Sequence, residues 1–216
     1  MLVSELSERA EVPLATVKYY LREGLLPAGE PTGPRRAEYD ECHLRRLRVL
    51  RLLREVGEVP VASLRQIVDA LDDADLPVHD AMAVIADVIS AGPEPGAQDP
   101  DALEMVDDLI TSMGWDRIRA ESVDRIRLAG LVSMLNGPGP LGASPEVLQF
   151  YAGLADHLAK TEISLVDHSA DRSRLLEDML TGSVVYGQVF AILRQLGHEH
   201  HHAEVVQAAA SGTPGA

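Results

Sequence analysis

The segment at residues 12–26, VPLATVKYYLREGLL, constrains the fold more than any other part of the chain. At ~100° per residue its side chains divide a helix into two arcs. The apolar arc contains Leu14, Val17, Tyr20, Leu21 and Gly24. The other arc is polar, cationic and free of carboxylates, and contains Ala15, Thr16, Lys18, Tyr19 and Arg22. Pro13 suits a helix start and Gly24 a helix end, so the pattern predicts a short helix with one core face and one cationic face.

The neighbouring segments predict the setting of this helix. Residues 4–10 form a second short helical pattern with Leu6 and Ala10 facing inward, and two short helices joined by a tight turn make a helix-turn-helix unit. Residues 27–38 contain three prolines and two glycines, followed by Arg35 and Arg36, and cannot be helical. They are interpreted as a wing-like loop carrying two cations. Periodicity alone leaves open an amphipathic helix whose polar face is only solvated.

A resemblance to a known family rests on specific residues of this region. They are Leu6, Val12, TVKYY at 16–20, GLL at 24–26, YDECHL at 39–44, the Leu/Arg-rich helix ending at Gly57, and residues 61–71. Together they resemble the N-terminal winged helix of the MerR family of bacterial transcription regulators, over about the first third of the chain. The chain departs from the family pattern at Glu11 (usually glycine), Lys18 (usually arginine) and Leu21 (usually glutamate). Its wing has Gly-Pro-Arg-Arg in place of Gly-Tyr-Arg.

The cationic arc and the resemblance together define a set of expected DNA-binding residues. Cations hold phosphates, while short polar groups reach base edges in a groove. The expected set is Ala15, Thr16, Lys18, Tyr19, Tyr20 and Arg22 on the helix, with Arg35, Arg36 and Tyr39 in the wing. The resemblance further implies a homodimer on double-stranded promoter DNA and RNA polymerase as a partner.

The net charge of −15 is distributed unevenly. Residues 1–70 contain 11 basic and 11 acidic residues and are neutral overall. Residues 71–216 contain the remaining 8 basic and 23 acidic residues, which accounts for the whole net charge. Because physiological salt screens exposed charges beyond ~8 Å, an acidic C-terminal part does not prevent a local cationic face from binding a polyanion.

The rest of the chain predicts a mainly α fold, in which an all-helical C-terminal domain follows the winged helix-turn-helix. The predicted division is residues 1–75 for DNA binding, 76–98 for a dimerisation helix and linker, 99–207 for the effector or dimerisation domain, and 208–216 for a disordered tail. A helix is expected at 78–90, and further helices at about 101–113, 116–135, 144–168 and 171–200. The breaks between them fall at the Gly- and Pro-rich segments 92–100 and 137–140.

The C-terminal domain holds most of the larger apolar side chains. In the MerR family the variable C-terminal domain binds the effector, and methionines and aromatic rings suit adaptable apolar pockets. The expected effector-binding residues are Met105, Met113, Trp115, Met134, Phe150, Tyr151, Tyr186 and Phe190. The expected ligand is an apolar or cationic small molecule, with a purely structural or protein-binding helical bundle as the alternative.

Other chemistry has weaker support in the sequence. No phosphate loop, nucleophile elbow or paired cysteine is present, so we expect no enzyme, no catalytic residue and no cofactor. His198 and His202, at i and i+4, have workable spacing for a metal, but no metal site is assigned and a metal sensor stays an alternative. The second alternative is a helical ligand-sequestering or protein-interaction protein whose winged helix is non-functional. Without a run of ~18 apolar residues or a signal pattern, the chain is expected to be cytoplasmic and not in the membrane.

Overall fold

The structure, a computed structural model, describes residues 1–33, 36–90, 99–136 and 144–210, with only the helical backbone given for 208–210. Its first part is a winged helix-turn-helix. The elements are α1 (Val3–Ala10), α2 (Leu14–Arg22), β1 (Glu30–Gly33), β2 (Arg36–Glu38), α3 (Glu41–Glu55) and α4 (Val61–Asp72). The two strands pair antiparallel, with Glu30 opposite Glu38 and Pro31 opposite Ala37. The predicted winged helix-turn-helix is therefore present.

Helix α3 begins at a capping box. The Asp40 carboxylate accepts hydrogen bonds from the backbone N–H groups of Cys42 (2.9 Å) and His43 (3.1 Å), and the His43 ring closes the box. Hydrogen bonds from the His43 side chain and backbone lower the pKa of Asp40. Asp40 is therefore the N-cap of α3. It fixes the point at which the chain leaves the wing and enters the core.

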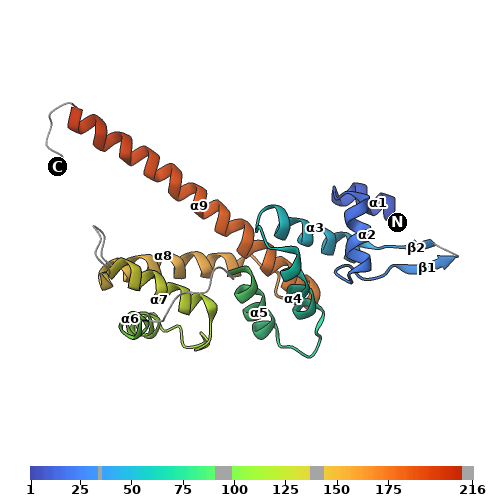
Figure 1. Ribbon diagram of the computed structural model, residues 1–216, viewed down its shortest axis with the longest axis horizontal. Coiled ribbons are helices and arrows are strands. Elements are labelled where there is room, and N and C mark those ends of the chain that lie inside the picture. Colours follow the sequence, from blue (N-terminus) through green and yellow to red (C-terminus); the bar gives the residue numbers. More distant parts are fainter. Residues whose placement is uncertain (34–35, 91–98, 137–143, 211–216) are drawn as a thin grey trace.

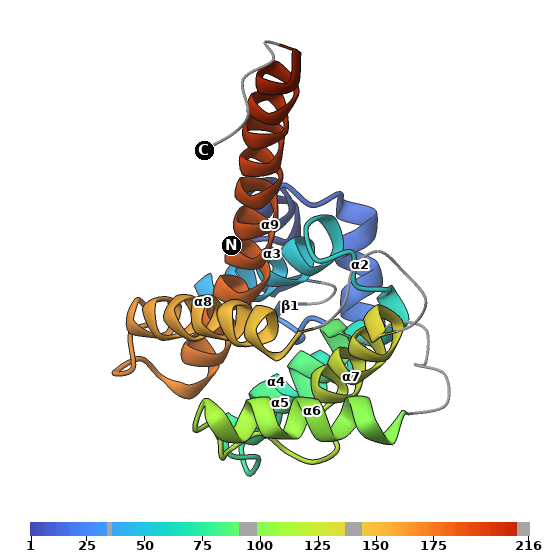
Figure 2. The ribbon, with the colours of Figure 1, turned by 90° about the vertical axis from the view of Figure 1, so that its left-hand side faces the viewer.

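The remaining helices are α5 (Val78–Ser90), α6 (Pro100–Ser112), α7 (Val123–Asn136), α8 (Pro145–Ser164) and α9 (Arg172–Ala210). Helices α6, α7 and α8 lie together on one side of α5, away from the wing (Figure 1). Helix α9 starts beside α3 and α4, and its C-terminal half projects away from the rest of the molecule in both views (Figures 1 and 2). The predicted mainly α fold is confirmed. None of the helices in the described ranges is long and apolar enough to cross a membrane.

The main hydrophobic core joins the winged helix to two later helices. Ala81 and Ile85 of α5 are completely buried in it, and so are Leu176 and Leu180 of α9. Helix α5 forms over the predicted residues 78–90, but its apolar face is covered by α4 and α9 of the same chain. The beginning of α9 is therefore part of the structural unit that contains the winged helix. The predicted domain boundaries stay a prediction.

A smaller core lies between α6 and α7, where Ala102 and Val106 face Ala129 and Val132. A two-pronged ion pair supports it, because Arg125 Nε and Nη2 each donate to an Asp107 carboxylate oxygen at 2.6 Å. This unit contains few large buried side chains. Most of the exposed large hydrophobic residues of the described chain lie on α7, α8 and α9.

Two sequence predictions about helix ends are wrong. The helix expected at 116–135 begins only at Val123, since Arg119 binds Asp87 of α5 (2.7 Å) and Asp87 also accepts the Val123 N–H (3.2 Å). These contacts with another element hold residues before Val123 in turns and outweigh local helix propensity. At the C-terminal end, the helix expected to end at about residue 200 continues to Ala210. Residues 211–216 and the expected breaks at 92–98 and 137–140 lie outside the described residues.

A buried ion cluster fixes α9 against α3. Glu177 of α9 is 2% exposed and accepts hydrogen bonds from Arg45 Nε (2.6 Å) and Arg46 Nε (2.8 Å). Arg46 also binds Asp72 at the end of α4 (2.7 Å). Burial acts to lower the pKa of Arg46, but its hydrogen bonds to Asp72 and Glu177 outweigh burial and raise it. Each buried charge in the cluster therefore has an opposite charge beside it.

We predict that Glu177→Ala lowers the free energy of unfolding by about 3–5 kcal/mol, because it leaves the buried Arg46 charge without one of its partners. Urea unfolding followed by circular dichroism, at a fixed protein concentration, measures the change. Asp178→Ala is the matched control, because the neighbouring Asp178 is partly exposed and makes only a 3.6 Å pair with Arg174. Equal effects of the two substitutions would contradict this role of Glu177.

Candidate nucleic-acid interface

The turn between α1 and α2 sets the orientation of α2. Ser7 Oγ donates to the Val12 carbonyl at 2.6 Å, and the Val12 N–H donates to the Ser7 carbonyl at 3.0 Å. Val17 and Tyr20 on the inner face of α2 are buried against the core, together with Leu6 and Ala10 of α1. With one face packed in this way, the opposite face of α2 is presented to solvent.

Glu11 occupies the turn position at which the MerR pattern usually has glycine. Its φ of 54° lies in the left-handed region, which favours glycine. Arg51 of α3 holds this turn, since Arg51 Nη1 binds the Glu11 carboxylate (2.6 Å) and the Ala10 carbonyl (3.2 Å). The hydrogen bond from Arg51 lowers the pKa of Glu11. The turn geometry is thus kept without glycine by a contact from another helix.

The exposed face of α2 carries the predicted cationic set. Ala15, Lys18 and Arg22 are exposed, and Thr16 and Tyr19 are half-buried between them and the core. The Arg22 guanidinium lies over the Tyr19 ring, 5.3 Å from its centroid, and its Nε is 3.2 Å from Glu23. Within the described ranges Lys18 has no carboxylate within ion-pairing distance. The face therefore combines at least one uncompensated cation with short polar groups and an aromatic edge.

Two of the expected DNA-binding residues lie inside the protein. Tyr20 is 5% exposed, and burial raises the pKa of its phenol. Tyr39 is also buried, and its ring packs edge-on against His43 with the centroids 5.2 Å apart. The Tyr39 backbone pairs with Met1, through N–H to carbonyl (2.8 Å) and through the terminal ammonium to the Tyr39 carbonyl (2.8 Å). Both tyrosines support the surface from beneath.

The wing carries one described cation. Arg36 is exposed on β2, whereas Arg35 lies outside the described residues. The base of the wing is tightly packed, because a Cβ on Gly29 would lie 2.6 Å from the Glu38 carbonyl oxygen. Since any larger side chain at Gly29 would push the two strand ends apart, this glycine holds the position of the wing.

The arginines of α3 are used inside the protein. The sequence suggests mainly a solubilising face, with one or two of them near phosphate. In the structure Arg45 and Arg46 bind Glu177, Arg48 donates to the Arg9 carbonyl (3.2 Å), and Arg54 donates to the Val59 carbonyl. A single glutamate 131 residues away along the chain from Arg46 has no local sequence signal. The sequence analysis therefore missed this use of α3.

The structure brings together some of the expected effector-binding residues. Met105 lines a cavity of about 230 Å³ between α6 and α8, with Leu109, Leu148 and Gln149 among its other lining residues. Gln149 Nε2 donates a hydrogen bond to the Met113 sulfur (3.2 Å), and the Trp115 indole N–H donates one to the Asp156 carboxylate of α8 (3.1 Å). These three residues lie along the α6–α8 seam. The other five are exposed on the surfaces of α7, α8 and α9: Met134, Phe150, Tyr151, Tyr186 and Phe190.

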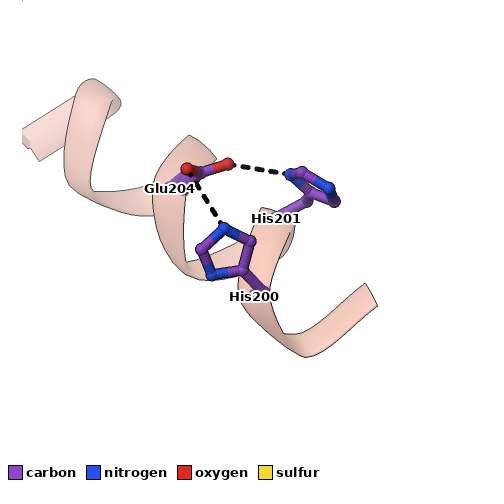
Figure 3. A group of neighbouring side chains, drawn as sticks. All are labelled: His200, His201 and Glu204. Atoms are coloured by element: carbon purple, nitrogen blue, oxygen red, sulfur yellow. Dashed lines mark hydrogen bonds and ion pairs between the residues drawn. The ribbon is translucent and has the colours of Figure 1, made fainter. Parts of the chain in front are cut away.

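The C-terminal histidines lie on the projecting part of α9. The rings of His198 and His202, the pair suggested by sequence spacing, have centroids 5.9 Å apart. A different group, His200, His201 and Glu204, has donor atoms that all lie within 4.8 Å of one another (Figure 3). Sequence spacing alone did not single out this second group.

Comparisons with known proteins identify the family of this chain. Residues 1–71 match the model of the MerR HTH family regulatory protein. The whole chain is similar to a solved structure described as "putative transcriptional regulator SCO5550 from Streptomyces coelicolor A3(2)". The two share 30% sequence identity and a TM-score of 0.73, over 94% of this chain and 97% of that one. No curated protein matches. The chain therefore belongs to the MerR family and is a DNA-binding transcription regulator.

Proposed function

We propose that this regulator binds a two-fold promoter site as a homodimer and responds to a small organic effector through its C-terminal helices. The observation that best supports sequence-specific DNA binding is the composition of the outer face of α2. It is cationic and free of carboxylates in a chain with a net charge of −15. In this proposal Lys18 and Arg22 bind phosphates, while Ala15, Thr16 and Tyr19 face base edges in the major groove. Arg36, with Arg35, contacts the phosphates flanking the site.

We predict that Lys18→Ala and Arg22→Ala each weaken binding to many DNA sequences, and reduce the slope of log affinity against log salt by about one unit per lost phosphate contact. Gel shifts on the protein's own upstream region, at several salt concentrations, measure this. The control is Arg174→Ala on α9, which removes an exposed cation without touching the wing or α2. Unchanged affinity in both α2 variants, with effector binding retained, would favour a ligand-sequestering protein whose winged helix is not used.

The second part of the proposal is a homodimer formed through α9. One recognition helix covers too few base pairs for a selective site, so two copies are needed about one or two helical turns of DNA apart. Helix α5 is covered within its own chain, whereas α9 beyond Val184 is exposed. Its apolar residues recur at spacings of three and four and form what we call the α9 stripe: Tyr186, Val189, Phe190, Leu193 and Leu196.

The chemistry of the α9 stripe suits a second copy of the same helix. Each of its residues is 40–59% exposed, although contiguous apolar surface on a helix normally lies against a partner. Arg194 is the only Lys or Arg between Tyr186 and Ala216, and the first acidic residue after Tyr186 is Glu199. Two stripes can therefore meet without strong repulsion between like charges.

We predict that Leu193→Glu converts a dimer into a monomer, because it places a carboxylate in the centre of the stripe. Light scattering at micromolar concentration measures the mass, with and without DNA. Gln195→Glu adds the same charge on the far side of the helix and should leave the dimer intact. A monomeric full-length protein under both conditions would remove this part of the proposal.

The third part concerns promoter action. By analogy with the family, the dimer distorts promoter DNA so that RNA polymerase can use a spacer that is too long. Such a mechanism requires the effector domain to be mechanically connected to the winged helix. Contacts of α9 with α3 and α4, and of Asp87 on α5 with Arg119 and Val123, provide connected elements. In vitro transcription from the protein's upstream region tests whether it activates or represses.

The effector part of the proposal rests on the α6–α8 seam. The cavity beside Met105 is lined by the apolar Leu109, Pro145 and Leu148 and by the polar Asp108, Ser112 and Gln149, and the domain around it is acidic. An apolar wall with a carboxylate among the polar lining groups suits a hydrophobic cation. Trp115, hydrogen-bonded to Asp156 at the same seam, places a fluorescent side chain near the site.

We predict that at least one hydrophobic cation or cationic antibiotic raises the melting temperature, in proportion to the logarithm of its concentration over its dissociation constant. A thermal-shift screen in EDTA, with Trp115 fluorescence as a second readout, tests this. Met105→Ala should reduce the shift, and Met134→Ala, on an exposed site of α7, should not. Stabilisation by zinc or nickel in the absence of EDTA, with no effect of any organic compound, would contradict an organic effector.

A further inference from the structure

Three metal-ligating side chains converge near the free end of α9 (Figure 3). His200 Nε2 lies 3.4 Å from one Glu204 carboxylate oxygen, and His201 Nδ1 lies 2.8 Å from the other. The three donor atoms all lie within 4.8 Å of one another. We propose that His200, His201 and Glu204 form a binding site for a divalent transition metal such as zinc, nickel or copper. This site is separate from the effector site and does not rest on the proposed function.

The ligand types indicate which cations fit. Two imidazole nitrogens and one carboxylate suit zinc, copper and nickel, whereas magnesium and calcium prefer a shell of oxygens. Glu204 follows His200 by four residues and His201 by three, so helix geometry brings its carboxylate beside both rings. Three ligands from one helix leave further coordination positions, which water fills.

The charge around the cluster favours a cation. Arg194 is the last Lys or Arg of the chain, and residues 195–216 contain Glu199 and Glu204 as their charged side chains, apart from histidine. The free part of α9 projects away from the other helices (Figures 1 and 2), so the arginines of the winged helix are remote. No ammonium or guanidinium of this segment therefore competes with a metal for Glu204.

The side chains are both accessible and already oriented. The side chains of His200, His201 and Glu204 are 68%, 74% and 58% exposed, so an ion reaches them without entering the protein interior. Contacts with Glu204 point both imidazoles at the same region, and a metal would replace these contacts with coordination bonds.

The His198–His202 pair is a competing candidate on the same segment. At ~100° per residue these two side chains lie on roughly the opposite side of α9 from His200 and Glu204. Within the described residues, the close grouping with a carboxylate occurs at His200, His201 and Glu204. The proposed site also follows Leu193 by two helical turns on the same face, so a bound ion would sit beyond the end of the α9 stripe.

Isothermal titration of the metal-free full-length chain with zinc chloride at pH 7.5 tests the site. Cys42→Ser is the background, because Cys42 is an exposed free thiol that could bind zinc itself. We expect one zinc ion per chain. His200→Ala and His201→Ala should each weaken the zinc affinity by at least about tenfold, since removing even a group that only orients a metal ligand costs about that much. The His198→Ala/His202→Ala double variant should bind as tightly as the background.

Two further measurements guard against indirect effects. The far-UV circular dichroism spectrum of each metal-free variant should match that of the background. A match shows that weaker zinc binding is not caused by loss of helical structure. Repeating the titration with magnesium chloride should show no comparable binding, because magnesium prefers a shell of oxygens. Absence of zinc binding at pH 7.5, or loss of binding in the His198/His202 variant with retention in the His200 and His201 variants, would overturn the proposal.

Discussion

The packing of the first part of α9 onto the winged helix is the contact on which the rest of the structure depends. Leu176 and Leu180 complete a core that the first 90 residues leave open, and Glu177 places a charge between two arginines of α3. Removing one member would leave a buried charge without its partner, which is far more costly than losing an exposed ion pair. The C-terminal helices are therefore held to the DNA-binding elements by both apolar and ionic contacts.

This arrangement also determines which cations remain available for DNA. Arg45, Arg46, Arg48, Arg51 and Arg54 all donate to acceptors within the protein. The cations left on the outer surface near the wing are chiefly Lys18, Arg22 and Arg36. A strongly basic helix thus serves to hold the fold together. The smaller set on α2 and the wing is the one that we propose contacts DNA.

The two parts of the chain differed in how much their sequences revealed. Around α2, local signals agreed with one another: a helix-starting Pro13, a helix-stopping Gly24, one apolar and one cationic arc, and a proline-rich wing. The resulting winged helix is present in the structure. The effector residues were chosen by residue type, and only Met105, Met113 and Trp115 lie along one seam. Residue type indicates what a pocket prefers but not which helices approach each other.

The sequence by itself determined the helical class, the winged helix and the composition of the outer face of α2, because short-range periodicity and turn chemistry specify these features. The tertiary structure decided that Tyr20 and Tyr39 are buried supports and that α5 lies in the core. It also decided that α9 continues the winged-helix core before it projects into solvent. These outcomes depend on contacts such as Arg46 to Glu177 between residues far apart in the chain. Their energies arise only when the helices are packed, so local sequence patterns do not contain them.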